Sequence, residues 1–433
     1  MITNPQVPLS RLALSLSEAF GWAHPSLSGH REGVAYIGIK IAREMGLHGR
    51  ELSDIFLAAV LHDIGLLITK QSGPGPQSKM PEDRTCLEAG FESLRGQPLF
   101  RNAAEIILNL HTPWDSGRGE QRLGRHVPMG SYILSVADAA DLAIDRSVPV
   151  ITQSETVRRK TTNMAGATLH ADCVEAFCSA AKPESFWLDA TSDRAYSVLL
   201  KQVDWMPLLL DEAATDSIAE IFASLVDGAS VWTATHSAAV AAVAVELAKR
   251  LNLSQREQIL MRVAGHLHDL GKLTVSASTL DKAGKPTPEE WAIIKAHPYH
   301  TFRLLDTIGG LPQITEWAAY HHERADGTGY PFRISGRDLT LGSRIMAVAD
   351  VFAAITEDRP YRKAMGRTAS VNLLGEMADS GSLDSDVVHT IRQNYDEIAS
   401  VCSAERANYA MKQNALADRI AASARDQHVR ITA

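Results

Sequence analysis

Apolar residues recur along this chain at helical spacing. Ile37, Ile41 and Met45 form one such stripe, because positions four apart lie on the same face of a helix. Strict alternation of apolar and polar residues, which would indicate half-buried strands, is nearly absent. The pattern therefore predicts an almost wholly α-helical chain. We expect one helical block from about residue 12 to 200 and another from about 206 to 400.

The two helical blocks repeat one another. His30 and His62 are 32 positions apart, and the same spacing separates His236 from His268. In each pair the second histidine is followed by aspartate, and each block contains a related segment, GSYILSVAD in the first and GSRIMAVAD in the second. Agreement of this extent indicates an internal duplication. We therefore predict an all-α protein built from two tandem helical bundles. We place these domains at residues 1–205 and 206–433.

Composition narrows the class of protein. The chain has 433 residues, more than one ordinary core accommodates, and its hydrophobic content of 45% is normal for a globular protein. A net charge of −8 without a lysine- or arginine-rich segment argues against binding of nucleic acid polymers. The start of the sequence does not resemble a signal peptide, and no apolar run is long enough to span a membrane. Four scattered cysteines without a CxxC pair fit a reducing compartment, so we expect a cytoplasmic protein.

Histidine and aspartate gather in the second block around two segments, HLHDLGKL at 266–273 and HHERADGTGYP at 321–331. A single histidine on an apolar face is more often a core or surface residue than a ligand, so the ordered set carries the argument. Imidazole and carboxylate groups in such numbers are typical metal ligands. They would suit a buried two-metal site, in which one carboxylate bridges the ions and a hydroxide between them is the nucleophile. The candidate ligands are His236, His268, Asp269, His297, His321, His322 and Asp350.

The ordered pattern H…HD…K…HP…HHE…DGTGYP…VAD resembles the HD-GYP branch of the HD phosphohydrolases over roughly 212–400. The resemblance implies HD-type helical bundles and a metal-dependent phosphodiesterase that opens a cyclic dinucleotide. Cyclic di-GMP is the expected substrate, with the linear dinucleotide or mononucleotides as products. It also implies iron or manganese as the cofactor. Family members with three metals carry a glutamate one turn before the first histidine; Trp232 stands there and cannot ligate, so we expect two divalent ions.

The resemblance also assigns roles to individual residues. His236, His268 and Asp350 would hold one ion and share Asp269 with a second. Lys272 would lie beside the scissile phosphate, where a point charge stabilises developing negative charge. The second ion would be held by His297, His321 and His322. The segment DRPYRKA resembles one that contacts substrate phosphates through arginines, which bind phosphate oxygens bidentately. In this chain those arginines are Arg359 and Arg362, for which a solvated helix end is the alternative.

The loop that contains Gly329 and Tyr330 is a further substrate-binding candidate. In the family this loop is linked to closing the site and to contacts with diguanylate cyclase domains. The alternative is a plain turn, in which glycine frees the backbone and Pro331 restricts it. A homodimer is compatible with the sequence but is not indicated by any motif.

The first block keeps only part of the ligand pattern. His30, His62, Asp63 and Asp138 preserve a four-ligand set, enough for one metal ion. Leu66 stands where the second block has its lysine, the double histidine is reduced to His111, and no counterpart of His297 is evident between 63 and 110. This combination favours a degenerate regulatory or scaffolding domain. A mononuclear phosphohydrolase and a metal-free relic are the alternatives.

Two other functions compete with a cyclic dinucleotide phosphodiesterase for the whole chain. One is a non-catalytic signalling module that binds a nucleotide or a partner protein. The complete ligand set with Lys272 speaks against it, because a pure binding module has no need of these groups. The other is an HD phosphohydrolase that acts on a different nucleotide.

Overall fold

The computed structural model describes residues 6–23, 29–69, 84–122, 124–202, 207–209, 218–219, 221–223, 235–282, 284–358 and 363–431. The chain divides into two compact units. The first unit comprises Pro8–Leu208 and Arg419–Ala433, and the second comprises Met1–Val7 and Leu209–Asp418. In the described residues, no helix is long and apolar enough to cross a membrane.

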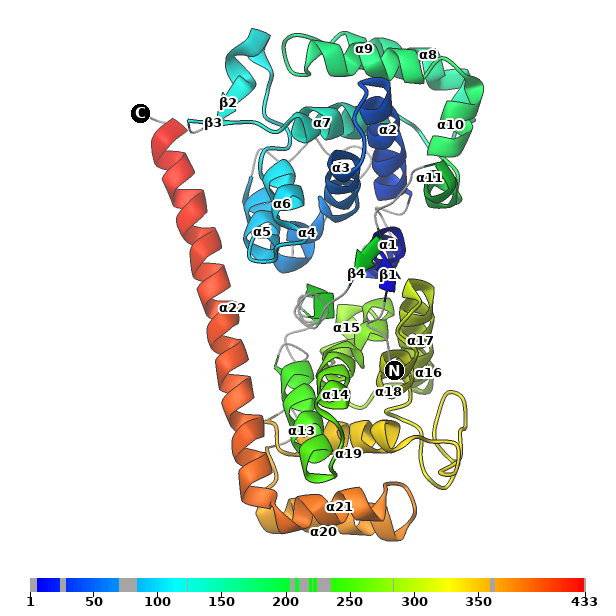
Figure 1. The fold of residues 1–433 in the computed structure, drawn as a ribbon, viewed down its shortest axis with the longest axis vertical. Coiled ribbons are helices and arrows are strands. Elements are labelled where there is room, and N and C mark those ends of the chain that lie inside the picture. Colours follow the sequence, from blue (N-terminus) through cyan, green and yellow to red (C-terminus); the bar gives the residue numbers. More distant parts are fainter. Residues whose placement is uncertain are drawn as a thin grey trace. The chain divides into compact units, whose positions relative to one another are not determined.

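Helices make up nearly all of the regular structure in the first unit (Figure 1). A short antiparallel pair, β2 (Gln121–Arg122) and β3 (Arg125–His126), and a 3₁₀ helix, η2 (Asp115–Glu120), interrupt them. The helices are α1 (Leu9–Ala23), α2 (His30–Glu44), α3 (Arg50–Leu61), α4 (Ile64–Thr69), α5 (Thr85–Leu94), α6 (Arg101–Leu108), α7 (Met129–Leu142), α8 (Val150–Thr162), α9 (Ala171–Ala180), α10 (Glu184–Ala190) and α11 (Ala195–Gln202).

The second unit is helical as well. Three-residue strands, β1 (Gln6–Pro8) and β4 (Pro207–Leu209), lie at the boundaries of the units in the sequence. The helices are α13 (His236–Arg250), α14 (Gln255–Leu267), the 3₁₀ helix η3 (Leu270–Thr274), α15 (Ala277–Leu280), α16 (Pro288–Lys295), α17 (His297–Ile308), α18 (Pro312–Ala319), α19 (Leu341–Ile355), α20 (Arg367–Asp379), α21 (Ser385–Gln393) and α22 (Tyr395–Ile431). The residues of α22 from Arg419 onward are assigned to the first unit. The prediction of an all-α fold is confirmed.

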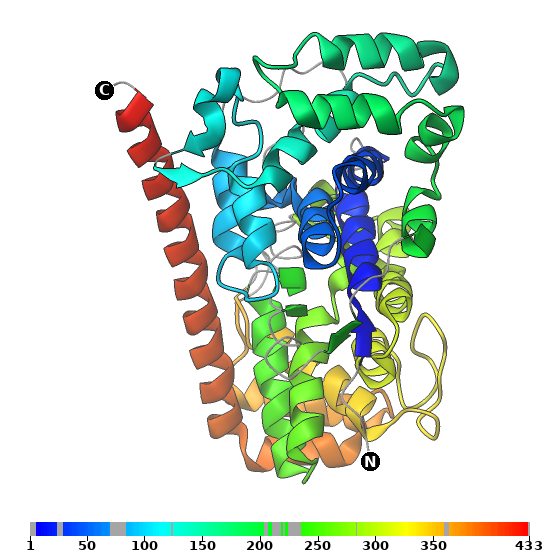
Figure 2. The ribbon, with the colours of Figure 1, turned by 45° about the horizontal axis from the view of Figure 1, so that its top comes forward.

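Close packing of α13 against α14 positions the chemistry of the second unit. The two helices lie side by side in both views (Figures 1 and 2). Their contact is tight at Gly265, where an added Cβ atom would lie 2.4 Å from the Cα atom of Ala241. A capping box formed by Ser254 and Glu257 fixes the start of α14. Because α13 packs along α14, the start of α13 meets the end of α14. In the first unit, α2 and α3 pack in the same way.

Candidate metal centres

The second unit brings all seven predicted ligands of the second block together. His236 is the first residue of α13, His268 follows the last residue of α14, and His297 opens α17. Asp350 lies within α19, and the paired histidines follow α18. Subsets of three converge so closely that their ligand atoms lie within 4.8 Å of one another. These subsets are His236–His268–Asp350, His268–Asp269–His321 and His297–His321–His322.

Asp269 lies at the centre of this cluster. Its Oδ2 atom is 3.3 Å from Nε2 of His268, while its Oδ1 atom is 3.3 Å from Nε2 of His297. Oδ1 also lies 4.0 Å from Nε2 of His321. On the side of His268, Oδ1 of Asp350 is 3.0 Å from Nε2 of His236 and 3.8 Å from His268. The two oxygens of one carboxylate therefore face two different sets of imidazoles, which is the arrangement of a bridging ligand.

Backbone carbonyls orient three of the imidazoles. Nδ1 of His268 lies 2.8 Å from the carbonyl oxygen of Gly265. The corresponding distance is 2.7 Å from Nδ1 of His297 to the carbonyl of Ile294, and 2.6 Å from Nδ1 of His321 to that of Ala318. Because a carbonyl can only accept, each Nδ1 carries the proton and donates it. The Nε2 lone pair of each ring then faces the cluster, as a metal ligand requires.

The electrostatics of the cluster keep its carboxylates charged and the imidazole of His322 neutral. At His236 burial lowers the pKa, but hydrogen bonds to Asp350 and Glu357 raise it above its ordinary value. Burial alone would raise the pKa of both aspartates. However, His236 holds the pKa of Asp350 well below its ordinary value, and His268 with Lys272 does the same for Asp269. Burial, together with the neighbouring imidazole of His297, lowers the pKa of His322 to about 3. The cluster thus presents charged carboxylates and a neutral imidazole at neutral pH, which is the donor set that divalent transition metals prefer.

The first unit contains a matching but smaller cluster. Nε2 of His30 is 3.2 Å from Oδ1 of Asp138, and Nε2 of His62 is 3.3 Å from Oδ1 of Asp63. His111, which sequence analysis left unassigned, brings its Nε2 atom to 3.8 Å from Oδ2 of Asp138. In the second unit, His322 approaches Asp350 in a comparable way but through its other nitrogen, with Nδ1 at 3.9 Å from Oδ2.

Among the described residues of the first unit, the second half of the cluster is absent for a visible reason. Gly65 packs so closely on Cys86 that an added Cβ atom would lie 1.8 Å from the carbonyl oxygen of Cys86. In the second unit Gly271 makes the same approach to His297, at 1.9 Å. Cys86 therefore occupies the backbone position of that histidine. It is buried beside Leu66, so an apolar pair replaces the lysine and the imidazole.

A buried glutamate braces the loop that follows the paired histidines. Glu323 is 2% exposed, and its carboxylate accepts hydrogen bonds from the backbone N–H groups of Phe332, at 2.7 Å, and Ile334, at 3.0 Å. Gly329 has no room for a side chain, because an added Cβ atom would lie 2.5 Å from the Cα atom of Glu323. The N–H of Tyr330 donates to the carbonyl of His322, at 3.2 Å. The loop is therefore fixed against the cluster.

Three of the residues that sequence analysis singled out lie outside the described residues: Trp232, Arg359 and Arg362. The structure also reveals supporting residues that sequence analysis missed. Thr301 donates to the carbonyl of His268, at 3.0 Å, and accepts from the N–H of Gly271, at 2.9 Å. Oε2 of Glu357 lies 3.6 Å from Nδ1 of His236. Of these supporting residues, only Glu323 could have been anticipated from the sequence, because it directly follows the two histidines.

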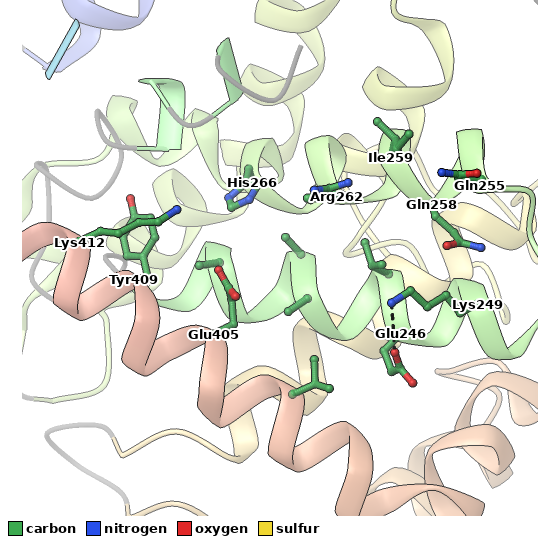
Figure 3. A pocket seen from close by; sticks show the side chains of 15 residues that line it. Glu246, Lys249, Gln255, Gln258, Ile259, Arg262, His266, Glu405, Tyr409 and Lys412 are labelled. Carbon is green, nitrogen blue, oxygen red and sulfur yellow. Dashed lines mark ion pairs between the residues drawn. The ribbon is translucent and has the colours of Figure 1, made fainter. Parts of the chain in front are cut away.

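A groove of about 590 Å³ lies between α13, α14 and α22 (Figure 3). His266 and Arg262 reach into it from α14, and Tyr409 and Lys412 reach toward it from α22. None of the seven ligands of the cluster lines it.

Comparison with known proteins agrees with the duplicated fold. A family profile described as HD domain matches residues 27–143, and a second profile with the same description matches 220–387. The 3'3'-cGAMP-specific phosphodiesterase 1 of Vibrio cholerae is 30% identical over 387 residues, which cover 87% of this chain and 89% of the relative. The chain belongs to the HD-GYP family of HD-domain proteins.

Other HD-GYP relatives match over one or both units. The 3'3'-cGAMP-specific phosphodiesterase 3 of Vibrio cholerae is 28% identical, covering 83% of this chain and 88% of its own length. A cyclic di-GMP phosphodiesterase of Pseudomonas aeruginosa is 38% identical over 157 residues, which cover 36% of this chain and 37% of the relative. The crystal structure of a cyclic GMP-AMP-specific phosphodiesterase from Vibrio cholerae superposes with a TM-score of 0.59 at 24% identity, covering 92% and 98% of the two chains. That structure shares the fold.

Proposed function

We propose that the second unit hydrolyses a phosphodiester bond of a cyclic dinucleotide with the help of two divalent metal ions. The observation that carries the proposal is the position of Asp269, whose two oxygens face two separate sets of imidazoles. Such a bridging carboxylate serves two ions, and two-metal sites are suited to displacement at phosphorus. A non-catalytic binding module would not need this arrangement.

The ligands divide between two ions around the shared carboxylate. We assign His236, His268 and Asp350 with Asp269 to one ion, and the remaining three histidines with Asp269 to the other. The donor set of imidazoles and carboxylates fits iron or manganese. When bound, the ions supply a water of lowered pKa as the nucleophile and neutralise the charge of the phosphate.

The side chains around the ions position the substrate. Lys272 contacts Oδ2 of Asp269 and is 21% exposed, so its ammonium lies where the cluster meets solvent. There it can stabilise negative charge that develops on a phosphate bound at the ions. Arg359 and Arg362 would bind the phosphates, and Tyr330 with Gly329 would line the same opening.

The preferred substrate is a cyclic purine dinucleotide. The sequence led us to expect cyclic di-GMP. The relatives that match over both units are phosphodiesterases of 3'3'-cGAMP, whereas the cyclic di-GMP phosphodiesterase of Pseudomonas aeruginosa matches over a shorter part of the chain. We therefore propose 3'3'-cGAMP as the preferred substrate and cyclic di-GMP as its competitor.

A turnover assay with a matched pair of variants tests this function. The full chain is prepared without oxygen, loaded with iron or manganese, and incubated with 3'3'-cGAMP, cyclic di-GMP and cyclic di-AMP. We expect hydrolysis by the wild type, none by Asp269→Ala, and wild-type rates for Asp63→Ala, which removes the corresponding carboxylate of the first unit. Full turnover by Asp269→Ala, or the absence of hydrolysis by the metal-loaded wild type, would refute the proposal.

For the first unit we propose a one-ion site without hydrolytic activity. Nε2 of His62 and Oδ2 of Asp63 are buried without a hydrogen-bond partner, although buried polar atoms are rarely left unsatisfied. A metal ion held by His30, His62, Asp63 and Asp138, with His111 at the exposed side, would satisfy them. Cys86 and Leu66 fill the place of the second ion and the lysine. This difference favours a regulatory role over catalysis.

Metal analysis separates this proposal from its alternatives. The full wild-type chain should bind three ions, and Asp63→Ala should bind two while it keeps its activity. A wild-type chain that binds only two ions would instead identify the first unit as a metal-free relic.

A further inference from the structure

In the described part of the second unit, solvent reaches the ligand cluster mainly at three side chains. The side chains of His236, His268, Asp269, His297 and His321 are at most 4% exposed. In contrast, the side chain of His322 is 28% exposed, that of Lys272 is 21% exposed, and that of Asp350 is 13% exposed. A substrate therefore reaches the ions past His322, and the residues that surround His322 line its path.

Aromatic side chains continue outward from His322. The ring of Tyr330 lies 4.9 Å from that of His322, measured between centroids, and the ring of Trp291 lies 6.4 Å from that of Tyr330. The Nζ atom of Lys295 lies 4.8 Å from the centre of the Tyr330 ring, in a cation–π contact. These contacts form an aromatic wall, which we define as Tyr330 and Trp291, at the opening of the cluster.

The outer member of this wall is held by a short but well-fixed helix. Trp291 and Lys295 are four positions apart on α16, so they share the face that looks toward Tyr330. A capping box formed by Thr287 and Glu290 fixes the start of the helix, and α17 with its ligand His297 follows its end. Nevertheless α16 buries none of its side chains, and Trp291 is 46% exposed. Trp291 therefore does not belong to the hydrophobic core.

The inner member of the wall is fixed independently. Tyr330 is tied to His322 through its backbone N–H, and the carboxylate of Glu323 braces the residues that follow it. The wall is therefore formed before any ligand binds. A preformed aromatic surface next to a phosphate-binding centre suits a nucleobase, because every base offers a flat face for stacking.

We propose that Trp291 is a substrate-binding residue that stacks on a base of the cyclic dinucleotide, with Tyr330 beside it and Lys295 adding positive charge near the phosphates. This inference rests on the proposed function. Stacking of one base on an aromatic side chain contributes about 1–3 kcal/mol, as judged by substitution with alanine. Loss of Trp291 should therefore raise KM for the cyclic dinucleotide roughly 5- to 150-fold, at tenfold per 1.4 kcal/mol, and leave the chemistry at the ions unchanged.

The test separates kcat from KM in variants of Trp291. The metal-loaded full chain is assayed with the cyclic dinucleotide that the wild type hydrolyses, at concentrations from below KM to saturation. We expect Trp291→Ala and Trp291→Leu to lower kcat/KM through KM, with kcat within twofold of the wild-type value. Trp291→Phe, which keeps an aromatic face, should retain most of the dinucleotide activity.

Ile293 provides the matched control. It lies on the same helix and is 51% exposed, but at two positions from Trp291 it points to the opposite side of α16. Ile293→Ala should leave both kcat and KM unaffected. An unchanged KM in both Trp291→Ala and Trp291→Leu would overturn the inference while the proposed function stands. If the wild type hydrolyses no cyclic dinucleotide, the proposed function fails first, so the two failures are distinguishable.

Discussion

Glu323 offers the sharpest test of how the site is built, because its two oxygens accept bonds from the backbone of the loop rather than facing the cluster. Glu323→Ala removes the acceptors of the N–H groups of Phe332 and Ile334. A buried donor left unsatisfied costs about 1–3 kcal/mol, so the two together should lower the free energy of unfolding by roughly 2–6 kcal/mol. Glu323→Gln keeps one acceptor oxygen, and its cost should be about half as large.

Urea unfolding of the metal-free protein measures this cost without a contribution from metal affinity. Glu316 is the control, since it also accepts two hydrogen bonds, but both reach a single oxygen, Oε1, from the hydroxyls of Thr340 and Ser343, and the amide of glutamine keeps such an oxygen. Glu316→Gln should therefore cost less than about 1 kcal/mol.

Metal content and kinetics complete the test of Glu323. Glu323→Gln should bind as many ions as the wild type, and its KM should rise because Tyr330 is no longer held in place. If the variant instead loses an ion while its free energy of unfolding is unchanged, Glu323 is a ligand and the brace is refuted.

Two further substitutions probe the catalytic side of the cluster. Lys272→Met should lower kcat about 100-fold, the scale of a lost charge-stabilising group, without a change in metal content; an unchanged kcat would remove this lysine from catalysis. Gly271→Ala places a Cβ atom 1.9 Å from the carbonyl oxygen of His297, so we expect a loss of roughly 1–3 kcal/mol of stability and of one bound ion. Gly375→Ala, where an added Cβ meets no atom within 4 Å, should be neutral or stabilising, as measured by urea unfolding.

The clustering of the candidate ligands could be predicted from the sequence, because their chemistry and spacing are local and repeated. The pairs His62–Asp63 and His268–Asp269 end equivalent helices, so one repeat predicts the other. Helical periodicity likewise predicted the all-α fold.

The supporting contacts could not be predicted, because they join residues that no periodic pattern connects. Glu323 reaches backbone groups nine and eleven positions later, across a loop whose course the sequence does not specify. Cys86 escaped notice because fewer residues separate it from Asp63 than separate His297 from Asp269. Only the shared close approach of a glycine to the following helix reveals that Cys86 and His297 occupy the same place.

A manganese titration of metal-free Asp63→Ala protein is the most direct test of the two-ion site proposed for the second unit, because only that unit then keeps its complete set of ligands. Bound metal and hydrolysis of the cyclic dinucleotide are followed together. The two-ion site predicts that hydrolysis rises with the second equivalent of metal and levels off at two bound ions per chain. Full activity with one bound ion, or two bound ions without hydrolysis, would contradict it.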